Sequence, residues 1–149
     1  MAVGGSASVH VDASPEAVYD LVADIGRMPE WSPETYRAHW LGGATSAVAG
    51  ARFRGWNKAG PLRWFTDPVV DVADRGRAFA FTTTFFGRGR LTTWRYDMTA
   101  AEGGGTTLTE SWEELVSVLG TLLPGMRKEG LQRGMEETLA RIKAAAEAS

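Results

Sequence analysis

From residue 35 to residue 116 the chain alternates short segments rich in Thr, Phe, Trp and Val with turns that contain glycine. Turn residues such as Gly42-Gly43 and Gly60-Pro61 mark the ends of these segments. The composition of the segments is typical of β-strands, and connections this short join antiparallel neighbours. The pattern predicts six strands, over 35–41, 51–58, 62–72, 77–85, 90–100 and 106–116.

A first strand and two short helices are predicted ahead of this region. The strand covers residues 6–12, and Ser14-Pro15 then supplies an N-cap residue and a first-turn proline. The helix that they begin is expected to end at Gly26. Because the residue before a proline avoids the helical region, Pro33 restricts the following segment, which contains Trp31, to about one further turn.

The last predicted element is a long amphipathic helix that begins at Pro124. Its apolar residues form one stripe: Leu131, Met135, Leu139 and Ile142. One antiparallel sheet of seven strands and one long C-terminal helix must bury their apolar faces against each other, which predicts an α+β fold. A sheet of this size curls, so one helix cannot fill its concave side. The remaining space is either packed by large side chains or left as a cavity.

The length of the chain, 149 residues, is typical of a single domain, which we expect to span residues 1–149. The net charge of −2 gives no general attraction for nucleic acid. Two histidines and no cysteine leave no pattern typical of a metal site, and no cofactor is expected. The first residues lack a basic start and an apolar run, so no signal peptide is expected, and the sequence has no run of about 18 apolar residues. We therefore expect a cytoplasmic monomer or homodimer without a membrane span.

Four short stretches carry a family resemblance. They are Ala13 to Tyr19, Met28-Pro29-Glu30-Trp31, Gly50-Ala51-Arg52-Phe53 and Thr106 to Glu110. In this order and spacing, from Ser6 to about Ala146, the chain resembles the polyketide cyclase/dehydrase family of the START-like (SRPBCC) superfamily. The resemblance implies the helix-grip fold of the birch pollen allergen, with the second short helix at the cavity entrance. Trp31 would then face the mouth of the cavity.

Strand alternation indicates which side chains point to the concave side of the sheet. Large apolar residues share these positions with a few polar ones, as in a small-molecule site. The expected ligand-binding residues are Trp31, Phe53, Trp64, Thr66, Phe81, Thr83, Trp94, Tyr96, Glu110, Trp112, Gly130 and Gly134. The two helical glycines are included because glycine within a helix is unfavourable by about 1 kcal/mol relative to Ala, and they would leave room for a ligand. Alternatively, rings of this size could fill the space completely.

Glu110 carries the most specific expectation. It alternates onto one face with Leu108 and Trp112, where desolvation would raise the pKa of its carboxyl unless a cation pairs with it. With a raised pKa, Glu110 could act as a general acid or base, with Tyr96 as its catalytic partner. The alternative is a glutamate at a strand edge, paired with a surface Arg.

Three functions are compatible with these residues. The first is binding of a hydrophobic small molecule, lipid-like or aromatic polyketide-like, in an internal cavity. The second is a polyketide aromatase/cyclase or dehydratase. The resemblance implies that such enzymes carry polar residues such as Arg on the inward face of the fourth strand, where this chain has Thr66 and Pro68. The third is a partner-binding role, which would require an exposed apolar patch on the long helix.

Overall fold

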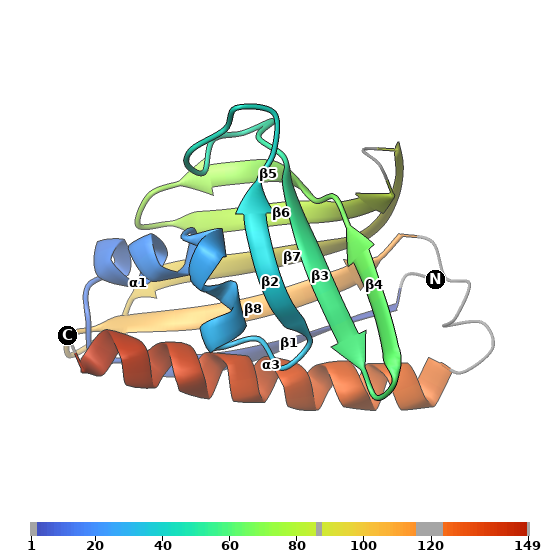
Figure 1. Ribbon diagram of the computed structural model, residues 1–149. Helices are drawn as coiled ribbons and strands as arrows, with labels where there is room; N and C mark the ends of the chain where they lie inside the picture. Colours follow the sequence, from blue (N-terminus) through green and yellow to red (C-terminus); the bar gives the residue numbers. More distant parts are fainter. Residues whose placement is uncertain (1–2, 86–87, 116–123, 149) are drawn as a thin grey trace.

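Residues 3–85, 88–115 and 124–148 are described in the computed structural model of the chain (Figure 1). Their helical elements are α1 (Pro15–Val22), the 3₁₀ helix η1 (Ile25–Glu30) and α3 (Pro124–Glu147). Their strands are β1 (Val3–Val11), β2 (Thr35–Trp40), β3 (Phe53–Ala59), β4 (Leu62–Thr66), β5 (Val69–Asp74), β6 (Ala78–Phe85), β7 (Arg88–Ala100) and β8 (Thr106–Glu114). The predicted end of the last strand, Val116, lies outside the described residues.

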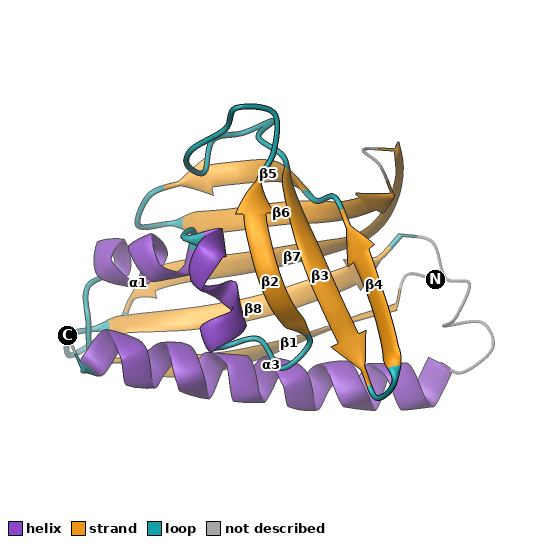
Figure 2. Cartoon of the chain, in the orientation of Figure 1, coloured by secondary structure: helices purple, strands orange, loops and turns teal. Residues whose placement is uncertain are grey.

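The strands form two sheets that lie across each other. Strands β1, β8, β7, β6 and β5 pair in that order, and β2, β3 and β4 form a smaller sheet, with antiparallel pairing in both. In Figure 1 the smaller sheet crosses in front of the larger one, and α3 runs along the lower edge near β1. Figure 2 shows the helices along one edge and at one end of the sheets. The predicted α+β arrangement, a curved antiparallel sheet against a long C-terminal helix, is confirmed.

The region predicted as one strand over 62–72 forms two strands, so the expected seven strands become eight among the described residues. The break falls at Asp67-Pro68, because proline has no N–H group to continue a strand ladder. The Asp67 N–H donates to the Thr84 carbonyl at 2.9 Å, and the Val70 N–H then donates to the Ala51 carbonyl at 2.8 Å. At this corner the chain leaves the smaller sheet and enters the larger one.

An ion pair between the half-buried Arg54 and the buried Asp67 holds the corner between the two sheets. Arg54 Nε donates to Asp67 Oδ1 at 2.7 Å, and Arg54 Nη2 donates to Asp67 Oδ2 at 2.9 Å. The Thr84 hydroxyl also donates to the Asp67 carbonyl. Asp67 is only 2% exposed, and the planar guanidinium satisfies both of its carboxylate oxygens. The corner is therefore fixed from both sheets.

The helices after β1 differ slightly from the prediction. Ser14 Oγ accepts a hydrogen bond of 3.1 Å from the Ala17 N–H, which confirms the expected N-cap. α1 ends at Val22 rather than at Gly26, because the chain tightens into the 3₁₀ helix η1, which begins at Ile25. This 3₁₀ helix is the second short helix that the sequence predicts.

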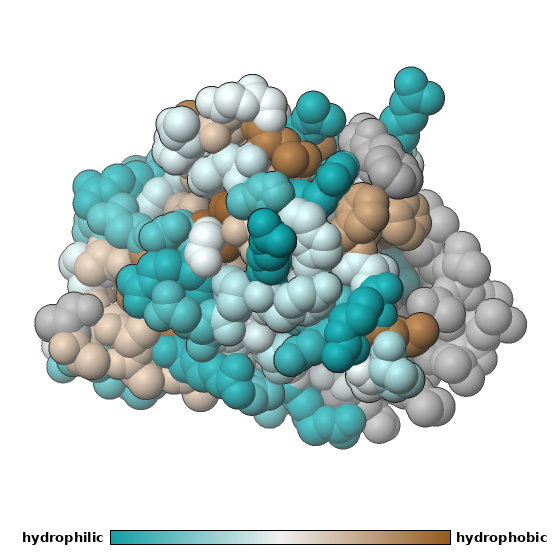
Figure 3. All heavy atoms as spheres, viewed as in Figure 1, coloured by the Kyte–Doolittle hydropathy of each residue, from teal (hydrophilic) through white to brown (hydrophobic). Residues whose placement is uncertain are grey.

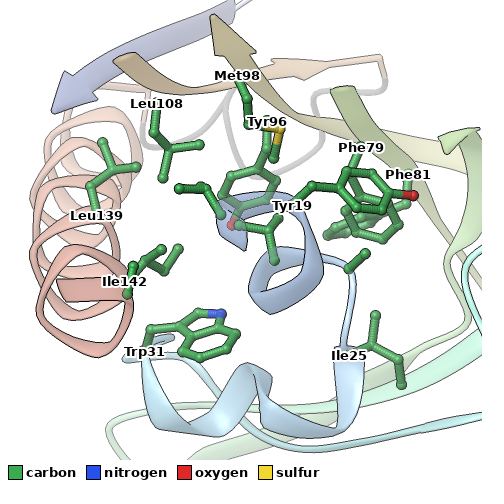
Figure 4. Packing of buried hydrophobic residues seen from close by; sticks show 14 of the residues in the cluster. Tyr19, Ile25, Trp31, Phe79, Phe81, Tyr96, Met98, Leu108, Leu139 and Ile142 are labelled. Atoms are coloured by element: carbon green, nitrogen blue, oxygen red, sulfur yellow. The ribbon is translucent and has the colours of Figure 1, made fainter. Parts of the chain in front are cut away.

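The hydrophobic core lies at the end of the sheet that α1 covers. Val18 of α1, Phe79 of β6 and Leu108 of β8 are fully buried there. Figure 4 shows buried side chains from α1, α3 and the larger sheet gathered at this end. In α3 the core residues Leu139 and Ile142 belong to its second half. α1 thus fills one end of the curved sheet, and the other end has a different environment.

Candidate ligand-binding cavity

A cavity of about 700 Å³ lies between the two sheets and the part of α3 that precedes the core residues. From α3 it is lined by Leu131, Gly134, Met135 and Thr138. Strands β3, β4, β6, β7 and β8 and the segment from Met28 to Thr35 supply the other walls, which are mostly apolar. The concave side of the sheet is therefore packed at the α1 end and hollow at the other end, rather than filled throughout by aromatic rings.

Aromatic rings from both sheets line this space. Phe53 of β3 meets the edge of Phe81 of β6, with ring centroids 5.2 Å apart. Phe81 is opposite Trp94 in the register of β6 and β7. Trp64 adds a further ring from β4. A flat apolar molecule in the cavity would therefore contact large rings on more than one side.

A buried polar pair forms part of the cavity wall. Tyr96 and Glu110 are opposite each other in the register of β7 and β8, and the Tyr96 hydroxyl donates to Glu110 Oε2 at 2.7 Å. Burial raises the pKa of Glu110 from 4.5 to about 8, although the hydrogen bond from Tyr96 lowers it. Burial and the neighbouring carboxyl raise the pKa of Tyr96 well above its ordinary value. Both groups are therefore mainly neutral at pH 7.

The second carboxyl oxygen of Glu110 has a different environment from the first. Within the described part of the chain, Glu110 Oε1 is buried and has no hydrogen-bond partner. A buried carboxylate without a compensating cation is strongly unfavourable, which agrees with a protonated side chain. With Oε2 accepting from Tyr96, Oε1 is the oxygen that can hold the proton. A protonated carboxyl in this position can give up its proton, and Glu110 is a buried residue rather than a surface residue paired with Arg.

Nine of the twelve residues that the sequence predicts as ligand-binding line the cavity. They are Phe53, Trp64, Thr66, Phe81, Thr83, Trp94, Tyr96, Glu110 and Gly134. All but Gly134 lie on strands, at the positions that alternation directs toward the concave side. The structure thus brings together most of the predicted set, including both candidate catalytic residues.

Trp31 does not line the cavity, contrary to the expectation that it faces the mouth. It is 2% exposed and belongs to the hydrophobic core, and Figure 4 shows its indole turned toward the interior. Its neighbours Met28, Ser32 and Pro33 line the cavity instead. Trp31 has the largest apolar surface of this segment, so its burial in the core releases the most water.

Trp112 and Gly130 also lie outside the cavity lining. Trp112 is buried, and a side-chain carbon placed on Gly5 of β1 would lie 3.1 Å from its Nε1, so the indole leans toward β1. Strand alternation identifies the face of a sheet but not the direction in which a long side chain leans along it. Gly130 is exposed, and a side-chain carbon there would have no atom within 4 Å.

Several lining residues are missing from the predicted set. Those on helices or loops are Met28, Ser32, Pro33, Glu34, Pro68, Leu131, Met135 and Thr138. Leu131 and Met135 belong to the apolar stripe of the last helix, so helical spacing predicts that they face inward. The spacing does not show whether an inward-facing side chain lines the cavity or packs in the core. Ser32, Pro33 and Glu34 carry no periodic signal, because their position depends on how the chain between η1 and β2 folds back.

An Arg on the inward face of the fourth strand, which the resemblance implies for enzymes, is not found there. Thr66 and Pro68 line the cavity at this point. Arg63 lies at the edge of the cavity, and its Nη1 donates to the Gly60 and Leu62 carbonyls at 2.7 and 2.9 Å. This guanidinium therefore stabilises the turn between β3 and β4.

Residues 3–85, 88–115 and 124–148 contain no cluster of three or more His, Asp or Glu side chains placed to hold a metal ion. None of their helices is both long enough and apolar enough to cross a membrane.

Solved structures share this fold. The structure of Zhui aromatase/cyclase from Streptomyces sp. R1128 matches with a TM-score of 0.71 and 16% identity, over 99% of this chain and 94% of that chain. The two-domain ARO/CYC StfQ of the steffimycin biosynthetic pathway matches with a TM-score of 0.74 and 16% identity, over 99% of this chain and 51% of that chain. The chain therefore has the helix-grip fold of these structures.

A family assignment follows from the sequence comparison. The family model described as polyketide cyclase / dehydrase and lipid transport matches residues 3–147. The chain belongs to this family. The Polyketide-cyc-like protein Cgl2372 from Corynebacterium glutamicum is 29% identical, over 99% of this chain and 93% of that chain, with a TM-score of 0.66. A search among curated proteins found no match.

Proposed function

We propose that the protein binds a hydrophobic small molecule, lipid-like or aromatic polyketide-like, in the cavity between the sheets and α3. The observation that carries this proposal is a mostly apolar space of about 700 Å³ whose wall includes the buried Tyr96–Glu110 pair. Small-molecule sites in proteins have volumes of roughly 300–1,000 Å³ and combine apolar walls with a few polar groups. The family description, which includes lipid transport, agrees with this role.

The lining indicates how such a ligand would be oriented. Its apolar body would lie against Phe53, Phe81 and Trp94, and its polar group would face Tyr96 and Glu110. Because Glu110 is mainly neutral at pH 7, this end of the cavity favours an uncharged hydroxyl or carbonyl. A ligand carboxylate placed there would be desolvated beside an acidic group and is disfavoured.

Native mass spectrometry of protein purified without added ligand tests the proposal directly. We expect a bound species that denaturation releases. Quenching of Trp fluorescence by a panel of fatty alcohols, fatty acids and polycyclic ketones then identifies the class, since Trp64 and Trp94 line the cavity. Saturable quenching by neutral members and weak quenching by the fatty acids are expected. The proposal would be contradicted if no species co-purified with the protein and no panel member quenched its Trp fluorescence.

The Tyr96–Glu110 pair favours a second candidate, a polyketide aromatase/cyclase or dehydratase. A neutral Glu110 could give its proton to a departing hydroxyl, which leaves as water. The resulting carboxylate would then take a proton from the adjacent carbon as the double bond forms, which restores the acid. Structural similarity to Zhui aromatase/cyclase and StfQ is compatible with this chemistry, although at 16% identity it concerns the fold alone.

A Glu110→Gln variant separates the two candidates. Gln keeps the shape and can accept the Tyr96 hydrogen bond but cannot transfer a proton. If the protein is an enzyme, turnover of a linear poly-β-ketone substrate is lost while binding persists. The exposed Glu113 on the same strand provides the control, Glu113→Gln. Normal turnover by Glu110→Gln would exclude Glu110 as the catalyst and leave the binding role unaffected.

A further inference from the structure

The outward face of the β2–β4 sheet concentrates basic side chains. Strand register places Arg37, Arg54, Lys58 and Arg63 on this side, together with Trp56 and Phe65. We call these six residues the basic sheet face. The smaller sheet faces the viewer in Figure 3, where its surface is mainly hydrophilic with isolated hydrophobic spots. The feature is notable because the whole chain carries a net charge of −2.

Few carboxylates oppose these cations among the described residues. Asp67 pairs with Arg54, and Glu34 lies at the start of β2, where its carbonyl accepts from the Lys58 N–H at 2.9 Å. Glu137 of α3 lines the same surface pocket as Lys58 and is paired with Arg141. Arg37 and Lys58 are exposed, so their charges reach solvent. A negatively charged surface would be attracted to this face.

The aromatic rings of the basic sheet face are already covered. The His39 ring stacks on Trp56 with centroids 4.9 Å apart, and the Arg37 guanidinium lies 4.8 Å from the centroid of the same ring. The Arg54 guanidinium lies 4.5 Å from the Phe65 centroid. Single-stranded nucleic acids bind by stacking bases on uncovered rings, and this face does not offer them. Its charge therefore suits a phosphate-bearing partner that does not need stacking.

The turn between β3 and β4 adds an apolar tip to the basic sheet face. Lys58 and Arg63 are opposite each other in the strand register. Between them in the chain lie the turn residue Pro61 and Leu62, the first residue of β4. Leu62 is 65% exposed and is the most exposed large hydrophobic residue described. Leu62 is opposite Ala59, so alternation directs it to the other side of the sheet from Lys58 and Arg63. The end of this hairpin therefore combines an exposed apolar side chain with one cation on each strand, which suits insertion between anionic lipid headgroups.

The tip also borders the cavity. Ala59, Leu62 and Arg63 contribute to the cavity lining, so whatever binds the turn contacts the rim of the cavity. We propose that the basic sheet face and the β3–β4 turn dock on the surface of an anionic phospholipid bilayer, with Leu62 inserted. Docking in this orientation brings the cavity rim to the membrane surface. An apolar ligand could then pass between the bilayer and the cavity with little exposure to water.

Flotation of the full chain with vesicles tests the docking. We expect binding to vesicles that contain phosphatidylglycerol, little binding to phosphatidylcholine alone, and loss of binding as salt increases. Reversing two charges in Lys58→Glu/Arg63→Glu should weaken binding roughly tenfold or more. Arg77, in the turn between β5 and β6, and Arg133 of α3 are exposed away from this face, so Arg77→Glu/Arg133→Glu provides a control with the same net charge. This control should bind within about twofold of wild type, and circular dichroism should verify folding of both variants.

Insertion of the tip can be measured separately because the chain has no cysteine. A Leu62→Cys variant labelled with an environment-sensitive fluorophore should shift to the blue with anionic vesicles. The same label at the exposed Glu102, in the turn after β7, should not respond. Equal loss of binding in both charge variants would overturn the proposal. The absence of a blue shift from the label at position 62 with anionic vesicles would also overturn it. So would saturable binding to an oligonucleotide or Leu62-dependent self-association without vesicle binding.

Discussion

The Tyr96 hydroxyl donates a 2.7 Å hydrogen bond to Glu110 across the pairing of β7 and β8, at the boundary between the hydrophobic core and the cavity. Tyr96 belongs to the core cluster and also lines the cavity. The pair is therefore held by the packed end of the sheet while it faces the hollow end. A ligand group that reaches the pair would meet polar atoms whose positions are fixed before binding, which lowers the entropy lost on association.

The pH dependence of stability should reveal the protonation state of Glu110. Its pKa is about 8 in the folded chain, against 4.5 for the free side chain. Between these values the folded state retains a proton that the unfolded state has lost, so the free energy of unfolding falls as pH rises from 4.5 to 8. Glu110→Gln does not ionise. Its stability relative to wild type should therefore rise through this window, by on the order of a few kcal/mol in total.

Thermal unfolding followed by circular dichroism at pH 5, 7 and 9 would measure this difference. The exposed Glu113 on β8 is a matched control, and Glu113→Gln should follow the wild-type curve closely. A constant difference in Tm between Glu110→Gln and wild type at all three pH values would show that Glu110 is ionised in the folded protein.

Filling the cavity from β3 should block the ligand without unfolding the protein. Gly55 is buried and lines the cavity, and a side-chain carbon there would meet only Thr35 Cγ2, at 3.9 Å. Gly55→Leu would project into the space and also favours the strand. We expect ligand affinity, measured by Trp fluorescence, to fall roughly tenfold or more while Tm is maintained. The exposed Thr99 on β7 provides the control, Thr99→Leu. Full binding by Gly55→Leu would place the ligand elsewhere.

Alanine substitutions at the two helical glycines, Gly130 and Gly134, should have different effects on stability and ligand binding. A side-chain carbon at Gly130 meets no atom within 4 Å, so Gly130→Ala should stabilise the protein by about 1 kcal/mol and leave ligand binding unchanged. Gly134 lines the cavity, and a side-chain carbon there makes ordinary contact with Pro33 at 3.7 Å. Gly134→Ala should reduce ligand affinity. Denaturant titration and fluorescence titration of both variants measure these effects, and equal binding by both would contradict the assignment.

Two turn glycines with similar backbone geometry should differ in their tolerance of alanine. Gly105 has φ +78° and Gly43 has φ +82°, both in the left-handed region. Gly43→Ala should therefore cost about 1 kcal/mol, from the backbone alone. A side-chain carbon at Gly105 would also lie 2.6 Å from the Val11 carbonyl oxygen, whereas Gly43 has open space. Gly105→Ala should lower the free energy of unfolding by clearly more, as measured in urea, and similar losses would contradict this packing.

Periodicity predicted the elements well because it follows directly from burial. Alternation placed Phe81, Trp94 and Glu110 on the concave face, and helical spacing identified the apolar stripe of α3. The break at Pro68 was missed, although proline rarely continues a paired strand, because the residues on both sides are typical of strands. A local composition signal outweighed a single backbone constraint in that prediction.

The candidate site was harder to predict because a cavity is a property of tertiary packing. The sequence identified Trp31 as special, but whether its indole enters the core or the mouth depends on space left by α1 and α3. The same holds for Trp112, which leans toward the gap left by Gly5 on a strand distant in sequence. A long side chain can occupy either of two neighbouring spaces, and those spaces form only when the helices and strands have packed together.

The corner at Asp67-Pro68 has a consequence for how this scaffold could acquire new ligands. The Arg54–Asp67 pair ties the smaller sheet to the larger one, yet neither side chain is among the cavity-lining residues. The width of the cavity is therefore set partly by atoms that a ligand would not contact. Substitutions at this joint would alter the size of molecule admitted while leaving every contact surface chemically the same.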